Sequence, residues 1–315
     1  MKKLLFIILF FPLYLQAWDI PGVGKFQFES VAKDVYVMHG PLEEPSKANL
    51  GFMNNPGFVL TRKGVILIDP GSSYQVGQQV LAEIKKITPL PVLAVFNTHI
   101  HGDHWLGNQA IKESYPKAKI YAHPAMIAQA KSDVGAGWID IMQNMTEGAI
   151  KGTKVVVPDK AVLQHEVITV SGHHFKVHSL KPAHTDTDIM IEHIESKTLF
   201  MGDNGFNKRM GRFDGSSNMH GAIKLLGYVK RLSVNTFVPG HGKSGGFDAA
   251  VKPFQEYLDK LQSIVKAGLE RDLEDYEIKE VAIKQLQGYK DWSGFEEQVG
   301  KHVFKMYLEI QSMAL

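Results

Sequence analysis

The chain has 315 residues, with 35 lysines and arginines against 33 aspartates and glutamates, and its formal net charge is +2 at pH 7. This near-neutral charge gives no basic footprint for nucleic acid, so we expect no nucleic-acid partner. The chain has no cysteine, which excludes disulfide bonds, thiol nucleophiles and iron–sulfur clusters. Its hydrophobic share of 44% is large enough to bury a core and argues against a mainly disordered chain.

Residues 1–17 have the layout of a secretory signal peptide. Two lysines follow Met1, residues 4–14 are almost wholly apolar, and Ala17 offers a small residue at a cleavage point. The apolar run is shorter than the roughly 20 residues that span a bilayer, so an uncleaved membrane anchor is the less favoured alternative. We expect an exported protein, located in a bacterial periplasm, with no stable membrane association after cleavage.

The residues that follow predict strands and helices in alternation. In chain order we expect a strand at 31–37, two strands within 57–69, a helix at 76–87, a strand at 92–97, a helix from 107 to 114 and a strand at 119–122. Residues 124–151 are predicted to be mainly helical, with interruptions at Gly135 and Gly137. Within them, residues 132–148 form either a lid over a substrate or an ordinary helix packed on the core.

A second batch of strands follows, and helices end the chain. Strands are predicted within 161–194 and at 198–201 and 236–238, and helices at 248–267, 275–287 and 294–312. No polar linker separates these parts. We therefore expect a main domain over 18–246 and a C-terminal helical extension over 247–315 that packs on it. These last helices either cover a pocket or form a dimer contact, and the oligomeric state is left open.

The strongest motif comes directly after the predicted strand at 92–97. It places His99, His101, Asp103 and His104 within six residues, around a glycine that allows a tight turn. A strand end followed by such a turn can point alternate side chains at one place. Imidazole and carboxylate groups are good ligands for zinc and neighbouring first-row metals. The motif therefore predicts a metal site.

Three further candidate ligands lie at the ends of separate predicted strands. They are His184, Asp203 and His241, and each has Gly or Pro close by, which lets the backbone turn sharply. Five histidines and two aspartates are too many for one tetrahedral zinc ion. They suit two metals that share one carboxylate.

Other polar residues are given structural roles. His123 ends a predicted strand, and His173 and His174 are expected on the surface in a turn. The basic loop over 204–213 is expected to be a solvated surface, with steering of an anionic substrate as the alternative. His220 is left unassigned.

The seven candidate ligands resemble those of the metallo-β-lactamase superfamily in type, order and spacing, over roughly residues 28–245. The resemblance implies a four-layer αββα sandwich of the α/β class, with the metals at the edge where the two sheets meet. It also implies that Asp69 supports the histidine loop from behind the ligands. It implies these ligands: His99, His101 and His184 for a first metal, Asp103, His104 and His241 for a second, and Asp203 between both.

The residue at position 203 indicates which subgroup of the superfamily the chain resembles. One group of true β-lactamases has Cys there and another has Ser, whereas the bridging Asp203 resembles the glyoxalase-II-like hydrolases. The segment 184–188 and the helical tail around 307–309 are similar to exported zinc metallohydrolases linked with quinoprotein systems.

The resemblance implies a binuclear zinc hydrolase that acts on a small molecule. Two zinc ions can lower the pKa of a shared water, and the resulting hydroxide attacks an acyl bond in a β-lactam, a thioester or an ester. Asp103 would be the catalytic residue that hydrogen-bonds this nucleophile and moves its proton. Export favours β-lactamase-like activity, and the bridging aspartate favours glyoxalase-II-like thioester hydrolysis.

Two alternatives come from other classes of protein. One is a mononuclear iron persulfide dioxygenase, in which His99, His184 and Asp203 hold Fe in place of zinc. The other is a non-catalytic accessory protein of a periplasmic quinoprotein system. Metal analysis separates the first from the hydrolase, and a retained partner without turnover would support the second.

Overall fold

The computed structural model describes residues 23–213 and 215–314. The predicted signal peptide at 1–17 therefore lies outside the described residues. None of the helices in the described part is long and apolar enough to cross a membrane.

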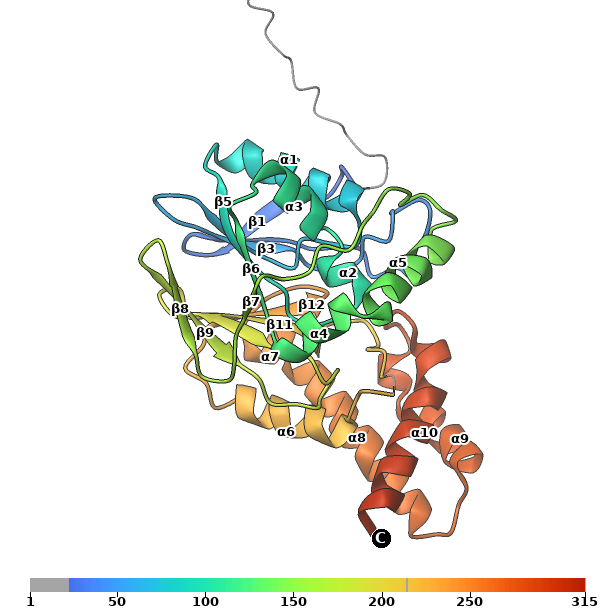
Figure 1. The fold of residues 1–315 in the computed structure, drawn as a ribbon. Helices are drawn as coiled ribbons and strands as arrows, with labels where there is room; N and C mark the ends of the chain where they lie inside the picture. Colours follow the sequence, from blue (N-terminus) through green and yellow to red (C-terminus); the bar gives the residue numbers. More distant parts are fainter. Residues whose placement is uncertain (1–22, 214, 315) are drawn as a thin grey trace, which may run out of the picture.

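Two β-sheets face each other at the centre of the described chain (Figure 1). The first sheet has its strands in sequence order, antiparallel from β1 to β4 and parallel from β4 to β7. Its strands are β1 (Phe28–Ala32), β2 (Val35–Met38), β3 (Gly57–Leu60), β4 (Val65–Ile68), β5 (Val92–Phe96), β6 (Lys119–Ala122) and β7 (Lys160–Ala161).

The second sheet has the order β12-β11-β10-β9-β8. Its strands β11 and β12 are parallel, and the other neighbours are antiparallel. The strands are β8 (Val167–Val170), β9 (His173–His178), β10 (Met190–His193), β11 (Thr198–Phe206) and β12 (Thr236–His241).

Helices cover the outer face of each sheet. On the first sheet, Leu67 packs in one apolar cluster with α1 (Tyr74–Ile87) and α3 (Asn108–Ser114). On the second, Leu199 and Met201 pack with α6 (Met219–Val229) and α8 (Lys252–Leu269). A third cluster, including Ile66 and Phe200, fills the space between the sheets. The expected four-layer αββα sandwich is thus confirmed.

The strand β4 shows why an unbroken apolar run was needed here. Successive side chains of a strand point to opposite faces. Ile66 and Ile68 accordingly face the second sheet, while Val65 and Leu67 face the helices. All four residues are buried, so both faces of the strand belong to the core.

Two predicted elements differ from the structure. The single strand expected at 31–37 is wrong, because Asp34 adopts φ 60° and turns the chain into the hairpin of β1 and β2. The helical stretch after 124 is not broken at its glycines. It breaks at Ser132, which ends α4 (Pro124–Lys131) and caps α5 (Asp133–Met145) through its side chain.

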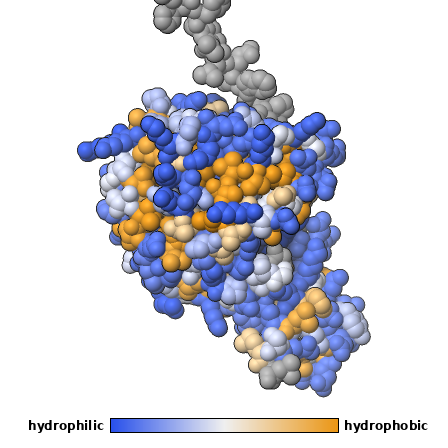
Figure 2. All heavy atoms as spheres, in the orientation of Figure 1, coloured by the Kyte–Doolittle hydropathy of each residue, from blue (hydrophilic) through white to orange (hydrophobic). Residues whose placement is uncertain are grey.

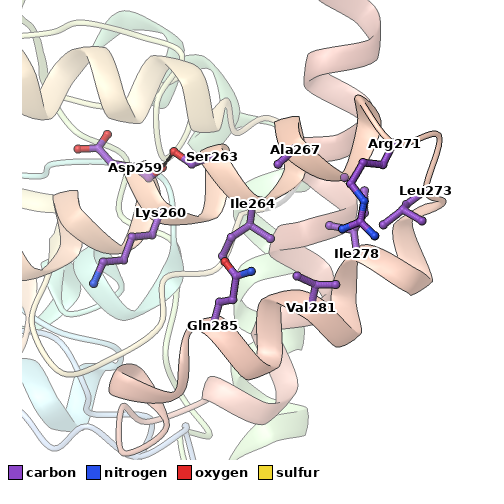
Figure 3. Close-up of a pocket in the computed structure, with 11 residues that line it drawn as sticks. Asp259, Lys260, Ser263, Ile264, Ala267, Arg271, Leu273, Ile278, Val281 and Gln285 are labelled. Atoms are coloured by element: carbon purple, nitrogen blue, oxygen red, sulfur yellow. Dashed lines mark hydrogen bonds between the residues drawn. The ribbon is translucent and has the colours of Figure 1, made fainter.

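The C-terminal helices pack on the second sheet through the same cluster as α6. They are α7 (Phe247–Ala250), α8, α9 (Asp275–Gln285) and α10 (Phe295–Ala314). Figure 1 shows α8, α9 and α10 extending away from the two sheets. Between α8 and α9 lies a hollow of about 610 Å³, into which Ile264 and Val281 project (Figure 3). Most of the surface of this extension is hydrophilic in Figure 2, whereas hydrophobic residues gather across the main body.

Glu309 of α10 joins the extension to the main domain. Its carboxylate accepts hydrogen bonds from the backbone amides of Met219 (2.9 Å) and His220 (3.1 Å), at the start of α6. It also pairs with His220 Nδ1 at 2.8 Å. The first amides of a helix have no acceptor within the helix, so this contact satisfies two of them from a distant part of the chain.

We expect Glu309→Ala to lower the free energy of unfolding by about 1–2 kcal/mol, because two helix amides lose their acceptor. Urea denaturation measures the change. Glu280→Ala, an exposed glutamate within α9, is the matched control and should change stability little. Equal effects of the two substitutions would contradict this role of Glu309.

Candidate metal centre

The seven candidate ligands come together at one edge of the sandwich. Ile68 lies opposite Phe96 in the parallel pair β4 and β5, so the chain leaves both strands side by side. Phe206 lies opposite His241 in the parallel pair β11 and β12. The segment after β5, the middle of β11 and the end of β12 therefore deliver all but one of the ligands, and the end of β4 delivers Asp69 behind them. His184 comes from the connection between β9 and β10.

The ligand atoms form two groups, and within each group they lie within 4.8 Å of one another. All seven side chains are buried. One group has three imidazoles and one carboxylate, and the other has two imidazoles and one carboxylate. The first group is His99, His101, His184 and Asp203, and the second is Asp103, His104 and His241.

Asp203 lies between the two groups and offers one oxygen to each. Its Oδ2 is 3.4 Å from His184 Nε2 and 3.9 Å from His99 Nε2. Its Oδ1 is 3.0 Å from His104 Nε2 and 3.2 Å from His241 Nε2. A Cβ atom at position 240 would lie 2.1 Å from Oδ1, so glycine is required where the chain passes this carboxylate.

Hydrogen bonds behind the ligands fix which imidazole nitrogens face the centre. His99 Nδ1 lies 3.0 Å from Thr98 Oγ1, which itself donates to Asp69, so the imidazole is the donor. His241 Nδ1 donates to the carbonyl oxygen of Met53 at 2.8 Å. In each ring the Nε2 atom is left as a lone pair pointing inward, which is the state a metal ligand needs.

Asp69 organises this arrangement from behind. Its carboxylate accepts hydrogen bonds from Thr98 N (2.8 Å), Thr98 Oγ1 (2.7 Å) and His104 Nδ1 (2.8 Å). Asp69 is buried and has φ 51°, a conformation that aspartate tolerates better than most residues. One carboxylate thus orients His104 and ties the histidine loop to the end of β4.

The centre carries polar atoms that the described protein leaves unsatisfied. His99 Nε2, Asp103 Oδ2 and Asp203 Oδ1 are buried and have no hydrogen-bond partner. His104 Nε2 and His241 Nε2 face each other at 3.4 Å. Buried polar groups without partners are costly. Because their lone pairs converge, a cation satisfies them together, and the donor set fits metal ions.

The electrostatics of the centre agree with this. Burial raises the pKa of Asp203, but the imidazoles of His241 and His104 lower it well below its usual value. Burial holds the pKa of His99 well below its usual value, and the neighbouring His104 lowers it further. The pKa of His104 shifts in the opposite direction. Burial lowers it, but the carboxylates of Asp203, Asp103 and Asp69 together raise it well above the ordinary value. The three carboxylates thus stabilise positive charge at this place, which favours a bound cation.

Aromatic and apolar side chains line the side of the centre nearest the first group. The ring of Trp138 on α5 lies 4.7 Å from that of His101, between ring centroids. Phe206 and Phe213 lie against His184, with centroids 5.7 Å and 6.2 Å away. Residues 132–148, expected as a lid or as a core helix, pack in the core through Met142 and lie against His101 through Trp138.

Sequence reasoning missed several residues that support the centre. Asp188 is buried and accepts hydrogen bonds from Thr185 N (2.8 Å) and Thr185 Oγ1 (2.6 Å), next to His184. Burial raises its pKa to about 7. Met53 was missed because it comes from a segment distant in sequence, and Trp138 was predicted only as part of the segment 132–148, without its contact to His101. Only Asp188 carried a signal, as the second aspartate of the segment 184–188.

The other polar residues singled out in the sequence lie elsewhere. His123 caps α4 by accepting from Ala125 N at 3.1 Å, which confirms a structural role. Arg209 is buried and pairs with Glu44 at 2.8 Å, and Arg212 binds the same carboxylate. Both arginines are thus engaged in holding the loop over 204–213. The turn expected at His173 and His174 is wrong, because both residues lie in β9.

Comparison with known proteins shows which family and which solved structures this chain is similar to. A family model described as the metallo-beta-lactamase superfamily matches residues 50–241. A metallo-beta-lactamase from Pontibacter korlensis aligns with a TM-score of 0.57 and 18% identity, over 74% of this chain and 99% of that one. The stereoselective inverting sec-alkylsulfatase Pisa1 from Pseudomonas sp. aligns with a TM-score of 0.66 and 16% identity, over 90% of this chain and 50% of that one. At these identities the two structures show a shared fold.

Among curated relatives, a hydroxyacylglutathione hydrolase from Synechococcus sp. (strain JA-2-3B'a(2-13)) is 30% identical over 162 residues. The match covers 51% of this chain and 52% of the relative, so the chain spans about half the length of the hydroxyacylglutathione hydrolase it matches. The family model covers more than half of this chain and includes all seven candidate ligands. The chain therefore belongs to the metallo-β-lactamase superfamily of metal-dependent hydrolases.

Proposed function

We propose that the chain is a binuclear zinc hydrolase that cleaves an acyl bond of a small molecule. The observation that carries the proposal is the face-to-face approach of His104 Nε2 and His241 Nε2 at 3.4 Å beside the unsatisfied Oδ1 of Asp203. A cation between these atoms would satisfy them together, which supports a metal at this place. A second set of donors lies on the other oxygen of Asp203, which supports two cations.

The proposed assignment follows the two groups. His99, His101 and His184 would hold one zinc ion, Asp103, His104 and His241 the other, and Asp203 both. Imidazole and carboxylate donors without thiolate suit zinc. When bound, a pair of zinc ions supplies an acidified water and an electrophilic contact for the substrate's carbonyl oxygen.

The chain's own residues would do the rest. Asp103 Oδ2 is buried, unsatisfied and 3.4 Å from both His104 Nε2 and His241 Nε2, so it is placed to orient the attacking water and to take its proton. Trp138, Phe206 and Phe213 would exclude bulk water from the side of His101 and His184. No serine or cysteine nucleophile is needed.

A thioester is the acyl bond that we favour. The hydroxyacylglutathione hydrolase relative supports it at 30% identity, and the carboxylate of Asp203 stands where some β-lactamases carry a different ligand. The β-lactam alternative draws on export, which stays a prediction because residues 1–22 lie outside the described part of the chain.

The iron dioxygenase alternative uses only His99, His184 and Asp203. It leaves no role for Asp103, His104 and His241, whose donor atoms form a second group of their own. The accessory-protein alternative likewise leaves the unsatisfied atoms of the centre without a use. Both therefore rank below the hydrolase.

A direct test combines elemental analysis with a hydrolysis screen over thioesters, β-lactams, lactones and esters. We expect two equivalents of zinc at the centre and turnover that chelation abolishes and zinc restores, fastest on a thioester. A protein that holds one iron and consumes oxygen would contradict the proposal. Turnover confined to β-lactams would retain the hydrolase and reject the thioester.

Asp103→Ala should lower kcat by at least about 100-fold, because the group that takes a proton in the reaction is removed. Elemental analysis should show one zinc equivalent less, while the far-ultraviolet circular dichroism spectrum stays unchanged. Asp140→Ala removes an exposed carboxylate of α5 and serves as the control. Unchanged turnover in Asp103→Ala would overturn its proposed role.

Asp69→Asn tests the support behind the ligands. An amide presents one oxygen and one N–H₂ group, so one of the donors on Thr98 or His104 would face another donor. We expect a loss of about 10- to 100-fold in zinc affinity or activity. Asp34→Asn is the matched control, because Asp34 also has a positive φ, 60°, and is exposed. Wild-type zinc affinity and activity in Asp69→Asn would refute this role.

A further inference from the structure

A second cluster of metal-ligating side chains lies in the second sheet, at the ends of the strands opposite to those that carry the candidate metal centre. The chain enters β9 at His173 after the turn at Ser171 and Gly172, which have φ 53° and 81°. It leaves β10 at His193 and enters β11 at Thr198. The candidate metal centre lies at the other end of β11, where Asp203 is found. Two neighbouring turns therefore bring His173, His193 and Glu195 together, away from that centre.

The three side chains converge on one place. His173 Nδ1 is 2.9 Å from His193 Nε2, and His193 Nε2 is 3.1 Å from Glu195 Oε2. The three ligand atoms all lie within 4.8 Å of one another. Tetrahedral zinc with ligand distances of about 2.0–2.1 Å keeps its ligands about 3.3 Å apart. The separations of 2.9 Å and 3.1 Å need to widen by only a few tenths of an ångström to reach that spacing.

Hydrogen bonds outside the cluster orient its ligands. Ser196 Oγ donates to Thr198 Oγ1 at 2.9 Å, so it accepts the proton of His193 Nδ1 at 2.7 Å. The Nε2 atom of His193 is then a lone pair that faces the carboxylate oxygen of Glu195. That lone pair can accept the proton of His173 Nδ1 at 2.9 Å, and a cation in place of this proton would bind the two nitrogens and the carboxylate oxygen together.

Glu195 is held in place from its other side. Its Oε1 accepts a hydrogen bond from His174 Nδ1 at 2.6 Å, and the backbone amide of His174 donates to the same oxygen at 3.1 Å. The same amide also lies 3.2 Å from Oε2, which keeps a further lone pair for the cluster. The side chain of His193 is 1% exposed and that of Glu195 is 37% exposed, so the site has a buried wall and an open side for a fourth ligand from solvent.

We propose that His173, His193 and Glu195 form a second, independent zinc site that ties the β8–β9 turn to the β10–β11 turn. Two imidazoles and one carboxylate are a ligand set that zinc accepts. Two of the ligands, His173 and His193, stand on the paired strands β9 and β10, and Glu195 lies in the turn that follows β10. Its role is structural, because it lies at the opposite ends of the strands from the candidate metal centre and so takes no part in the chemistry there.

Equilibrium dialysis of the whole chain against ZnCl₂, followed by elemental analysis, tests the proposal. Glu195→Gln and His173→Asn should each bind one zinc equivalent less than the wild type. Glu166→Gln and His165→Asn change the same residue types at exposed neighbouring positions and should bind as much as the wild type. Equal zinc content in all five proteins would overturn the proposal.

A second comparison keeps this result separate from the proposed function. In an Asp203→Ala background, which disturbs the candidate metal centre, Glu195→Gln should still remove one zinc equivalent. Turnover of the single variant Glu195→Gln should equal that of the wild type. A loss of zinc that appears only when Asp203 is intact would mean that the zinc belongs to the other centre, and would contradict the independent site.

Discussion

The constraint that shapes this molecule is a buried cluster of five imidazoles and two carboxylates, whose nitrogen and oxygen atoms converge in two groups. Hydrogen bonds that the imidazoles of His99, His104 and His241 donate to Thr98, Asp69 and Met53 orient these rings. The two oxygens of Asp203 face both ligand groups. Such an arrangement costs free energy when no cation is bound, and the packing of the surrounding fold holds the groups together in spite of this cost.

The sandwich explains how seven ligands from distant parts of the chain can meet. Parallel pairing of β4 with β5 and of β11 with β12 delivers strand ends to one edge. Apolar side chains between the sheets, such as Ile66 and Phe200, fix the distance between those edges. The C-terminal helices then close the outer face of the second sheet and reach back to α6 through Glu309. Function at one edge thus depends on packing throughout.

The sequence predicts the fold class and the seven candidate ligands because these ligands lie in short local patterns. Four of them fall within six residues, and the others follow apolar strands beside Gly or Pro. The fold class follows from alternating strands and helices. Local patterns could not reveal Trp138 against His101, the carbonyl of Met53, or the pairing of His173 with His193, since each depends on segments that only the tertiary fold brings together. The positive φ of Asp34, which splits one predicted strand into a hairpin, is likewise invisible in an apolar alternation.

The most direct test of the account is an anomalous diffraction measurement at the zinc edge on crystals of the zinc-loaded protein. The account predicts two peaks at this centre, about 3.5–4 Å apart, one beside each oxygen of Asp203. A single peak there, or zinc bound only at other places on the protein, would contradict it.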